Sequence, residues 1–169
     1  MVPAHEPIPV RREETDVVGL LRSSLRPLIE QAEEQKIELR VESMGRIPKL
    51  GVDPEKLAWA VSALVGNALR YVRRGTHQTI GGSVLVHVQH EEGSPEVAIA
   101  VQDDGPGIPR EKLPFLFERR GGAAHAEGLA LSLVREIVAA HRGRIEVESR
   151  TAQDDLEEHG TSITLWLPR

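Results

Sequence analysis

Residues 96–108 read EVAIAVQDDGPGI, a stretch in which a predicted strand leads into a glycine-rich turn. Its first half alternates apolar and polar side chains, as a strand with one buried face does. The strand ends in Asp103, and glycines follow at Gly105 and Gly107. A carboxylate at a strand end can accept a hydrogen bond from an exocyclic amine, and glycines let the backbone approach a flat ligand closely. A polar turn after a strand uses the same residue types, so this segment alone leaves both interpretations open.

The segments around this strand show further periodic patterns. Alternating or β-rich segments predict strands at 37–43, 83–90, 96–103, 144–149 and 161–167. Apolar residues at three- and four-residue spacing predict helices at 15–36, 54–72 and about 128–141. Because strands and helices do not alternate strictly, we expect an α/β (α+β) two-layer sandwich. Its helices pack on one face of a mixed sheet of about five strands.

Local signals mark the ends of these elements. Thr15 and Asp16 can cap the first helix, and Asp53 followed by Pro54 is typical of a helix start. Residues 1–13 carry three prolines and mixed charges, which is typical of an extended leader or linker stub. We therefore expect a leader at 1–13 and a single domain at 14–169.

The composition excludes several classes of function. With no cysteine among 169 residues, the chain has no disulfides, thiolate metal sites or cysteine nucleophiles. A net charge of −5 and 3% aromatic residues argue against a nucleic-acid-binding surface, which needs a basic patch and stacking side chains. No window approaches about 18 apolar residues, and the N-terminus lacks the apolar core of a signal peptide. We expect a cytoplasmic domain without nucleic-acid partners or direct membrane contact.

The helix expected at 54–72 has two faces. Its apolar stripe consists of Leu57, Val61, Leu64, Ala68 and Val72. Asn67, Arg70 and Tyr71 project from another side. A carboxamide oxygen such as that of Asn67 can bind Mg²⁺, which prefers oxygen ligands and keeps water and phosphate in its shell. A single asparagine on a helix is more often simply solvated.

A third candidate segment is AEGLAL, residues 126–131. Small residues lead into a helix N-terminus, where free backbone N–H groups and the helix dipole favour phosphate. A plain helix start explains the segment equally well.

Taken in order, these segments resemble the GHKL (Bergerat) ATP-binding fold, and within it the catalytic domain of two-component sensor histidine kinases. The resemblance covers about residues 15–168. The segments are similar to the family's N box, first glycine box, F box, second glycine box with its helix and strand, and terminal strand: ALVGNALRYV (63–72), DDGPGI (103–108), LPFLFERR (113–120), EGLALSLVREIVAAHRGRIEVES (127–149) and GTSITLWLP (160–168).

The resemblance implies ATP and Mg²⁺ as cofactors and assigns roles at the phosphate end. Asn67 binds the Mg²⁺ that bridges the phosphates, and Arg70 and Tyr71 flank the nucleotide. Gly128 and Leu129 close around the phosphates. The reaction implied is transfer of the γ-phosphoryl group to a histidine on a dimerisation domain, in a signal-transduction phosphorelay that ends on a response regulator.

The resemblance also assigns the base end of the site. Asp103 reads the adenine amino group. Gly105, Gly107 and Ile108 line the base pocket. All four residues match the first glycine box closely, so we expect the base to be recognised.

The phosphate end departs from the family pattern. Ala63 stands where these kinases usually carry a first asparagine. Ala126 and Ala130 replace two glycines of the second box, which is costly if either position needs a positive φ. Arg120 replaces the second aromatic residue of the F box. Residues 118–127 make a short ATP lid of ten residues.

The chain lacks a typical phosphorylation site. The acceptor histidine of these kinases lies on a long helix, whereas His5 is followed by prolines at 7 and 9. We interpret the histidines as surface or structural residues, and expect an acceptor domain in the same parent chain or another chain. We expect an isolated monomer. Two alternatives stay open: a degenerate module that acts through partner binding, and an anti-sigma-type serine kinase.

Overall fold

The computed structural model describes residues 7–118 and 126–169. Five strands form the main sheet in the order β2-β4-β5-β7-β6. Their bounds are β2 Glu38–Met44, β4 Ser83–Gln89, β5 Glu96–Asp103, β6 Arg144–Arg150 and β7 Gly160–Pro168. β2 and β4 are parallel, while the other neighbours are antiparallel. The mixed five-stranded sheet is therefore confirmed.

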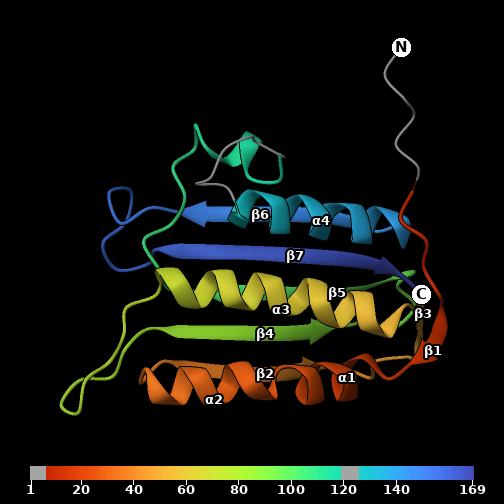
Figure 1. The fold of residues 1–169 in the computed structure, drawn as a ribbon, viewed down its shortest axis with the longest axis horizontal. Helices are drawn as coiled ribbons and strands as arrows, with labels where there is room; N and C mark the ends of the chain where they lie inside the picture. The colour runs from red at the N-terminus through yellow and green to blue at the C-terminus, as the bar shows by residue number, and fades with distance from the viewer. Residues whose placement is uncertain (1–6, 119–125) are drawn as a thin grey trace.

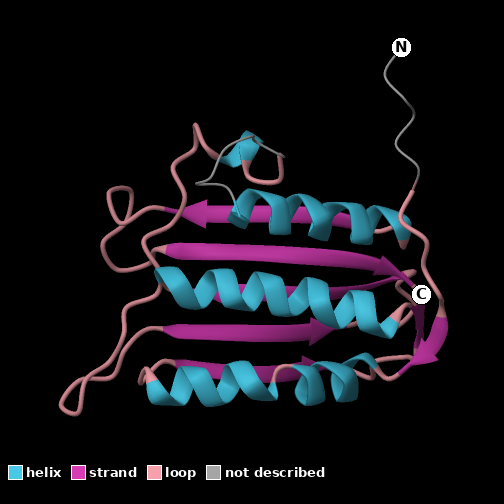
Figure 2. Ribbon diagram, viewed as in Figure 1, coloured by secondary structure: helices cyan, strands magenta, loops and turns pink. Residues whose placement is uncertain are grey.

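The helices cover one face of this sheet (Figures 1 and 2). They are α1 Val17–Ser24, α2 Arg26–Glu34, α3 Pro54–Tyr71 and α4 Ala126–Ala140. The apolar stripe of α3 is buried against the inward side chains of the strands, among them Val86, Ile99 and Leu165. Burial of one helix stripe and one sheet face produces the two-layer sandwich that the sequence predicts.

The single helix expected at 15–36 is wrong, because the chain forms α1 and α2 instead. Pro27 lies in the first turn of α2, where its missing N–H costs little, but it cannot continue α1. Thr15 ends the short strand β1 (Glu13–Thr15), which pairs with β3 (Leu50–Val52). Asp16 alone caps α1, with its carboxylate accepting from the Gly19 N–H at 3.1 Å.

The other expected elements are confirmed with small shifts. Asp53 caps α3, which ends at Tyr71, one residue before the expected end. α4 begins two residues earlier than expected. β4 and β5 pair as the predicted hairpin. A short 3₁₀ helix, η1 (Leu113–Phe115), lies in the segment after the first glycine box.

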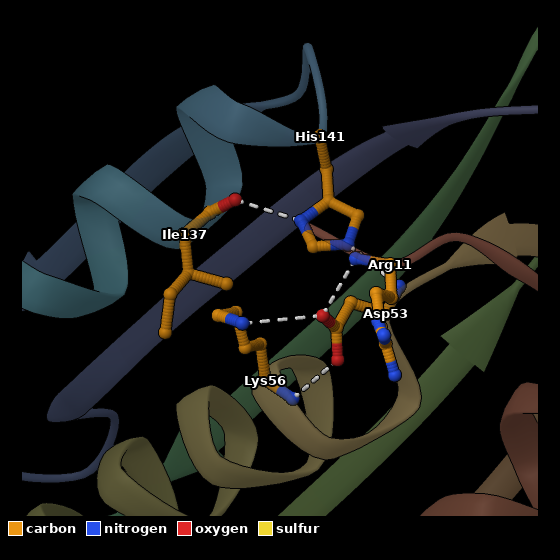
Figure 3. A network of polar contacts seen from close by, with 5 residues as sticks. All are labelled: Arg11, Asp53, Lys56, Ile137 and His141. Atoms are coloured by element: carbon orange, nitrogen blue, oxygen red, sulfur yellow. Dashed lines mark hydrogen bonds and ion pairs between the residues drawn. The ribbon is translucent and has the colours of Figure 1, made fainter. Parts of the chain in front are cut away.

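A buried polar network joins the N-terminus of α3 to the C-terminus of α4 (Figure 3). His141 accepts from the Asp53 N–H at Nε2 (2.9 Å) and faces the Ile137 carbonyl with Nδ1 (2.8 Å), which fits a neutral ring with its proton on Nδ1. Burial opposes ionisation of Asp53, but hydrogen bonds from Arg11 and Lys56 lower its pKa overall. The network joins the helix ends that lie away from Asn67 on α3 and Gly128 on α4.

The N-terminal segment is tied to this network. The Arg11 N–H donates to the Asp53 carboxylate at 2.9 Å, and the Arg12 guanidinium donates to the Ala140 carbonyl at 3.1 Å. Ile8 packs against the core, and residues 1–6 lie outside the described part of the chain. The division into a leader and a domain remains a prediction. In the described ranges, no helix has the length and apolar character needed to cross a bilayer.

Candidate functional site

A cavity of about 330 Å³ opens between the C-terminal half of α3, the end of β5 and the turn that follows it. Five of the predicted ligand-binding residues line this cavity: Asn67, Tyr71, Asp103, Gly107 and Ile108. They come from segments more than thirty positions apart, and the fold brings them to one place because α3 packs across the end of β5. Apolar side chains such as Leu64 and Val101 also line the cavity. The lining fits a flat, mainly apolar ligand with a few polar atoms.

Asp103 supplies the carboxylate at the end of β5. Its Oδ1 accepts from the Gly105 N–H at 2.9 Å, and the Thr161 N–H also donates to this carboxylate. Burial raises the pKa of Asp103; the two backbone hydrogen bonds only partly offset that effect, and the neighbouring Asp104 adds to it. The carboxylate is therefore a partly desolvated acceptor beside the cavity. A hydrogen bond from a ligand amine would replace the contacts with water that the carboxylate has lost.

The turn after Asp103 needs its glycines. Gly107 has φ +78°, and a Cβ there would collide with the Arg150 carbonyl. Gly105 does not line the cavity; it is buried against the Tyr71 backbone and orients the Asp103 carboxylate. Ile108 N–H donates to Ser149 Oγ at 2.7 Å. The sequence identified these positions by resemblance, and the structure supplies the contacts that require them.

Three residues around Asp103 and the glycine turn were not predicted from the sequence. Thr161 lines the cavity and lies opposite Asp103 in the β5–β7 register. Ser149 holds the Ile108 N–H, and His159 Nδ1 contacts the Gly105 carbonyl. Alternation along 161–167 could have placed Thr161 on the buried face. The pairing of the three strands, which brings these residues together, has no local signal.

The end of the site that the sequence predicts to hold phosphate borders a second hollow of about 240 Å³, between α3 and the first turns of α4. Asn67 and Leu131 line both cavities, so the two hollows adjoin. Arg70 lines the second hollow, together with small side chains that include Ala63 and Ala130. A ligand held at the base end can therefore extend past Asn67 toward Arg70.

The donor set at this end fits Mg²⁺ only as part of a phosphate complex. Asn67 offers one carboxamide oxygen, and no group of three His, Asp or Glu side chains among the described residues could hold a metal ion. Mg²⁺ commonly binds through one or two protein oxygens while phosphate and water complete its shell. Asn67 is placed for that arrangement.

The second glycine box forms the start of α4. Gly128 lies in its first turn, and Leu129 is 47% exposed and lines neither cavity, whereas Leu131 lines both. Ala126 and Ala130 both fall within the helix, where alanine is favourable, so neither position needs a positive φ. Arg120 and most of the expected lid (119–125) lie outside the described residues. Contact of Gly128 and Leu129 with phosphates stays a prediction.

Comparison with known proteins gives a family match. The sequence model of the family described as histidine kinase-, DNA gyrase B-, and HSP90-like ATPase matches residues 52–169. The alginate biosynthesis sensor protein KinB of Pseudomonas aeruginosa is 33% identical over 145 residues, which are 82% of this chain and 22% of KinB. The sensor histidine kinase ZraS of Escherichia coli (strain K12) is 30% identical over 164 residues, 96% of this chain and 32% of ZraS. The chain thus spans less than half of these relatives.

Solved structures agree on the fold. A mycobacterial sensor histidine kinase, MprB, is 26% identical with a TM-score of 0.75, covering 94% of this chain and 97% of that structure. Full-length ShkA in complex with AMPPNP reaches a TM-score of 0.79 at 23% identity, covering 96% of this chain and 32% of ShkA. At 23% identity, the similarity to ShkA is evidence for the fold alone.

Proposed function

This chain belongs to the histidine kinase-, DNA gyrase B- and HSP90-like ATPase family, and on that premise we propose that it is the ATP-binding catalytic domain of a sensor histidine kinase. It binds Mg·ATP and presents the γ-phosphoryl group to a histidine on a dimerisation domain of the same parent chain or another chain. A response regulator then receives the phosphoryl group. The same proposal places the domain in the cytoplasm and takes the isolated domain to be a monomer.

One observation carries this proposal: the carboxylate of Asp103, the glycine turn and the polar face of α3 border a single cavity. A buried acceptor at one end suits the exocyclic amine of adenine, because an amine restores the hydrogen bonds that burial removes. Asn67 lies where this cavity meets the second hollow, and Arg70 lies in that hollow. The arrangement supports a purine at Asp103 and phosphates beyond Asn67.

The protein's part in the reaction is binding and orientation. In phosphoryl transfer, the bond from the γ-phosphorus to the bridging oxygen breaks as a new bond to the acceptor nitrogen forms, and ADP leaves. Mg²⁺, when bound, would neutralise part of the phosphate charge. Asn67 provides an oxygen for that ion, Arg70 provides positive charge, and Asp103 fixes the base so that the phosphates reach them.

The proposal is tested by calorimetric titration of ATP and ADP, with and without Mg²⁺. We expect wild-type protein to bind both nucleotides and to bind ATP more tightly with Mg²⁺. Asn67→Ala should remove that Mg²⁺-dependent gain, which we expect to be about tenfold, the worth of one charge-assisted contact. Absence of nucleotide binding at millimolar ATP would contradict the proposal.

A second candidate is a module that holds the base but turns over ATP poorly. The lining of the second hollow favours it, since Ala63, Gly66 and Ala130 offer no side-chain hydrogen bonds to phosphate. Phosphotransfer to a supplied dimerisation domain separates the two: a labelled acceptor histidine supports the kinase, and ADP binding without transfer supports the module.

A further inference from the structure

A lysine lies at the mouth of the base cavity. Among the described residues that line this cavity, the only charged ones are Asp103 and Lys112. Asp103 is partly buried at the end of β5, whereas Lys112 is exposed on the segment between the glycine turn and η1. The rest of the lining is mainly apolar and includes Ile108, Pro109 and Leu116. The cavity therefore combines a partly desolvated acceptor with a cation that water reaches.

The backbone around Lys112 is held in place. Its N–H donates to the Pro109 carbonyl at 2.9 Å, and its carbonyl accepts from the Phe115 N–H at 3.1 Å. Leu116 follows on the same segment, lines the same cavity and packs against the hydrophobic core, as Phe117 does. Because this turn is already ordered, little backbone entropy is lost when Lys112 meets a ligand.

The ammonium of Lys112 differs in its contacts from the lysine at the start of α3. Lys56 is paired with Asp53, whereas the Lys112 ammonium forms neither an ion pair nor a hydrogen bond within the described part of the chain. A lysine carries its charge on a flexible four-carbon stem and can turn it toward an anion. The charge is therefore available to a ligand whose acidic group lies at the mouth of the cavity.

We infer that Lys112 is a specificity-determining residue, whose ammonium pairs with the phosphate nearest the ribose when the base lies against Asp103. This charge selects a nucleotide over the free nucleoside, which has the same base and ribose but no phosphate. The inference rests on the nucleotide binding proposed above. It concerns the first phosphate, whereas Asn67 and Arg70 border the hollow proposed for the later ones.

The test compares the affinities of adenosine and AMP by calorimetry, without Mg²⁺. Wild-type protein should bind AMP about fivefold more tightly than adenosine, the worth of an ion pair that water still reaches. Lys112→Met keeps most of the length of the side chain and should bind the two ligands about equally, because the charge is gone. Lys112→Arg should keep the preference for AMP. Lys112→Glu should reverse it, since a carboxylate repels the phosphate.

Salt separates an electrostatic role of Lys112 from a structural one. The preference of wild-type protein for AMP should shrink as the ionic strength rises from about 0.05 M to about 0.5 M, because mobile ions screen an exposed pair. In Lys112→Met, the ratio of the two affinities should not change with salt. A lysine that only held the turn in place would alter the binding of both ligands alike at every ionic strength, and that result would contradict the inference.

Arg110→Met is the matched control. Arg110 lies on the same exposed segment and lines neither cavity, so this variant removes the same charge without touching the site. It should keep the wild-type preference for AMP. The inference is overturned, while nucleotide binding stands, if wild-type protein shows no such preference, if Lys112→Met retains it, or if Arg110→Met loses it equally. If wild-type protein binds neither AMP nor ADP, then the proposed function fails first.

Discussion

The two ends of the candidate site are built differently. At the base end, the protein has already made the hydrogen bonds that hold its parts: Gly105 N–H to Asp103, Ile108 N–H to Ser149, and Ala152 N–H to the Pro106 carbonyl. The phosphate end is a hollow lined largely by small side chains, with Asn67 and Arg70 as its charged or amide groups.

This difference indicates which end supplies the affinity. A group that is ordered before binding loses little conformational entropy when the ligand arrives, so its contacts count nearly in full. The base end has that property. In the proposed binding mode, the ligand brings a metal ion to the phosphate end, and the protein adds only the Asn67 oxygen and the Arg70 charge. We expect changes at the base end to weaken binding more than changes at the phosphate end.

The largest effect is expected from Asp103→Asn. The amide NH₂ would face the ligand amine with a second donor, so ADP affinity should fall by on the order of 100-fold, about 3 kcal/mol. Because burial raises the pKa of Asp103, removing its charge should not lower the free energy of unfolding. Calorimetry and urea denaturation measure the two quantities.

Asp104→Asn is the control for that variant. Asp104 accepts from the Ser83 N–H through Oδ1 at 2.8 Å, away from the cavity lining, and asparagine keeps that oxygen. Its ADP affinity should match wild type. Equal losses in both variants would mean that general charge near β5, rather than the Asp103 contact, governs binding.

Sequence periodicity predicted what depends on one segment at a time. Helix α3, its Asp53 cap and the hairpin of β4 and β5 all follow from local patterns, and the structure confirms them. The break between α1 and α2 has a local cause in Pro27, but the apolar spacing runs through it unchanged. Strands β1 and β3 have three residues each, too few for alternation to show.

The residues of the site divide in the same way, into those that a local motif predicts and those that it does not. Asp103 and Gly107 were found because they lie in one motif, whereas Ser149 and Thr161 reach it only through the register of β6, β7 and β5. Register depends on pairing between distant segments, which a single sequence does not specify locally. The base end was therefore recognised by its ligand-facing residues, while the residues that support them were not.

The next effect in size is expected from Gly107→Ala. The positive φ costs about 1 kcal/mol for alanine, and the Cβ would also collide with the Arg150 carbonyl and displace the turn. ADP affinity should fall about tenfold or more, because displacement of the base site by about 1 Å is costly. Both stability and affinity should drop.

Gly93→Ala separates the two causes. Gly93 has φ +82° but no atom within 4 Å of the added Cβ, so only the conformational cost applies. Its stability should fall by about 1 kcal/mol with unchanged ADP affinity. If Gly107→Ala behaves like Gly93→Ala, then the turn tolerates displacement and the base end is less rigid than its contacts indicate.

The pH dependence of binding follows from the raised pKa of Asp103. The ionised carboxylate accepts the ligand amine, so ADP affinity should be constant at neutral pH and fall as pH drops through the raised pKa, by about tenfold for each unit below it. The stability of the free protein depends on pH with the opposite sign. Native Asp103 holds its proton more tightly than the unfolded chain, so its contribution to stability is lost as pH rises from 3.8 through the raised value.

Titrations of ADP between pH 4 and pH 8, about the span over which carboxyl and imidazole groups titrate, measure this profile. Asp103→Asn, tested at higher nucleotide concentration, should give a flat profile. If the ADP affinity of this variant still falls at low pH, then the proton that weakens binding is taken up by another group.

The smallest effect is expected from Ala63→Asn, which adds a carboxamide to the phosphate end. Ala63 lines the hollow of about 240 Å³ one turn before Asn67, so the larger side chain has room beside the position proposed for Mg²⁺. Mg·ATP should bind about threefold more tightly, while ADP without Mg²⁺ should bind as before. Ala58→Asn bears the same helix-propensity cost, about 0.5 kcal/mol, on a part of α3 that lines neither cavity, and should leave both affinities unchanged. If Ala63→Asn gains nothing over Ala58→Asn, small side chains are not what weakens the phosphate end, and the contrast between the two ends rests on the base contacts alone.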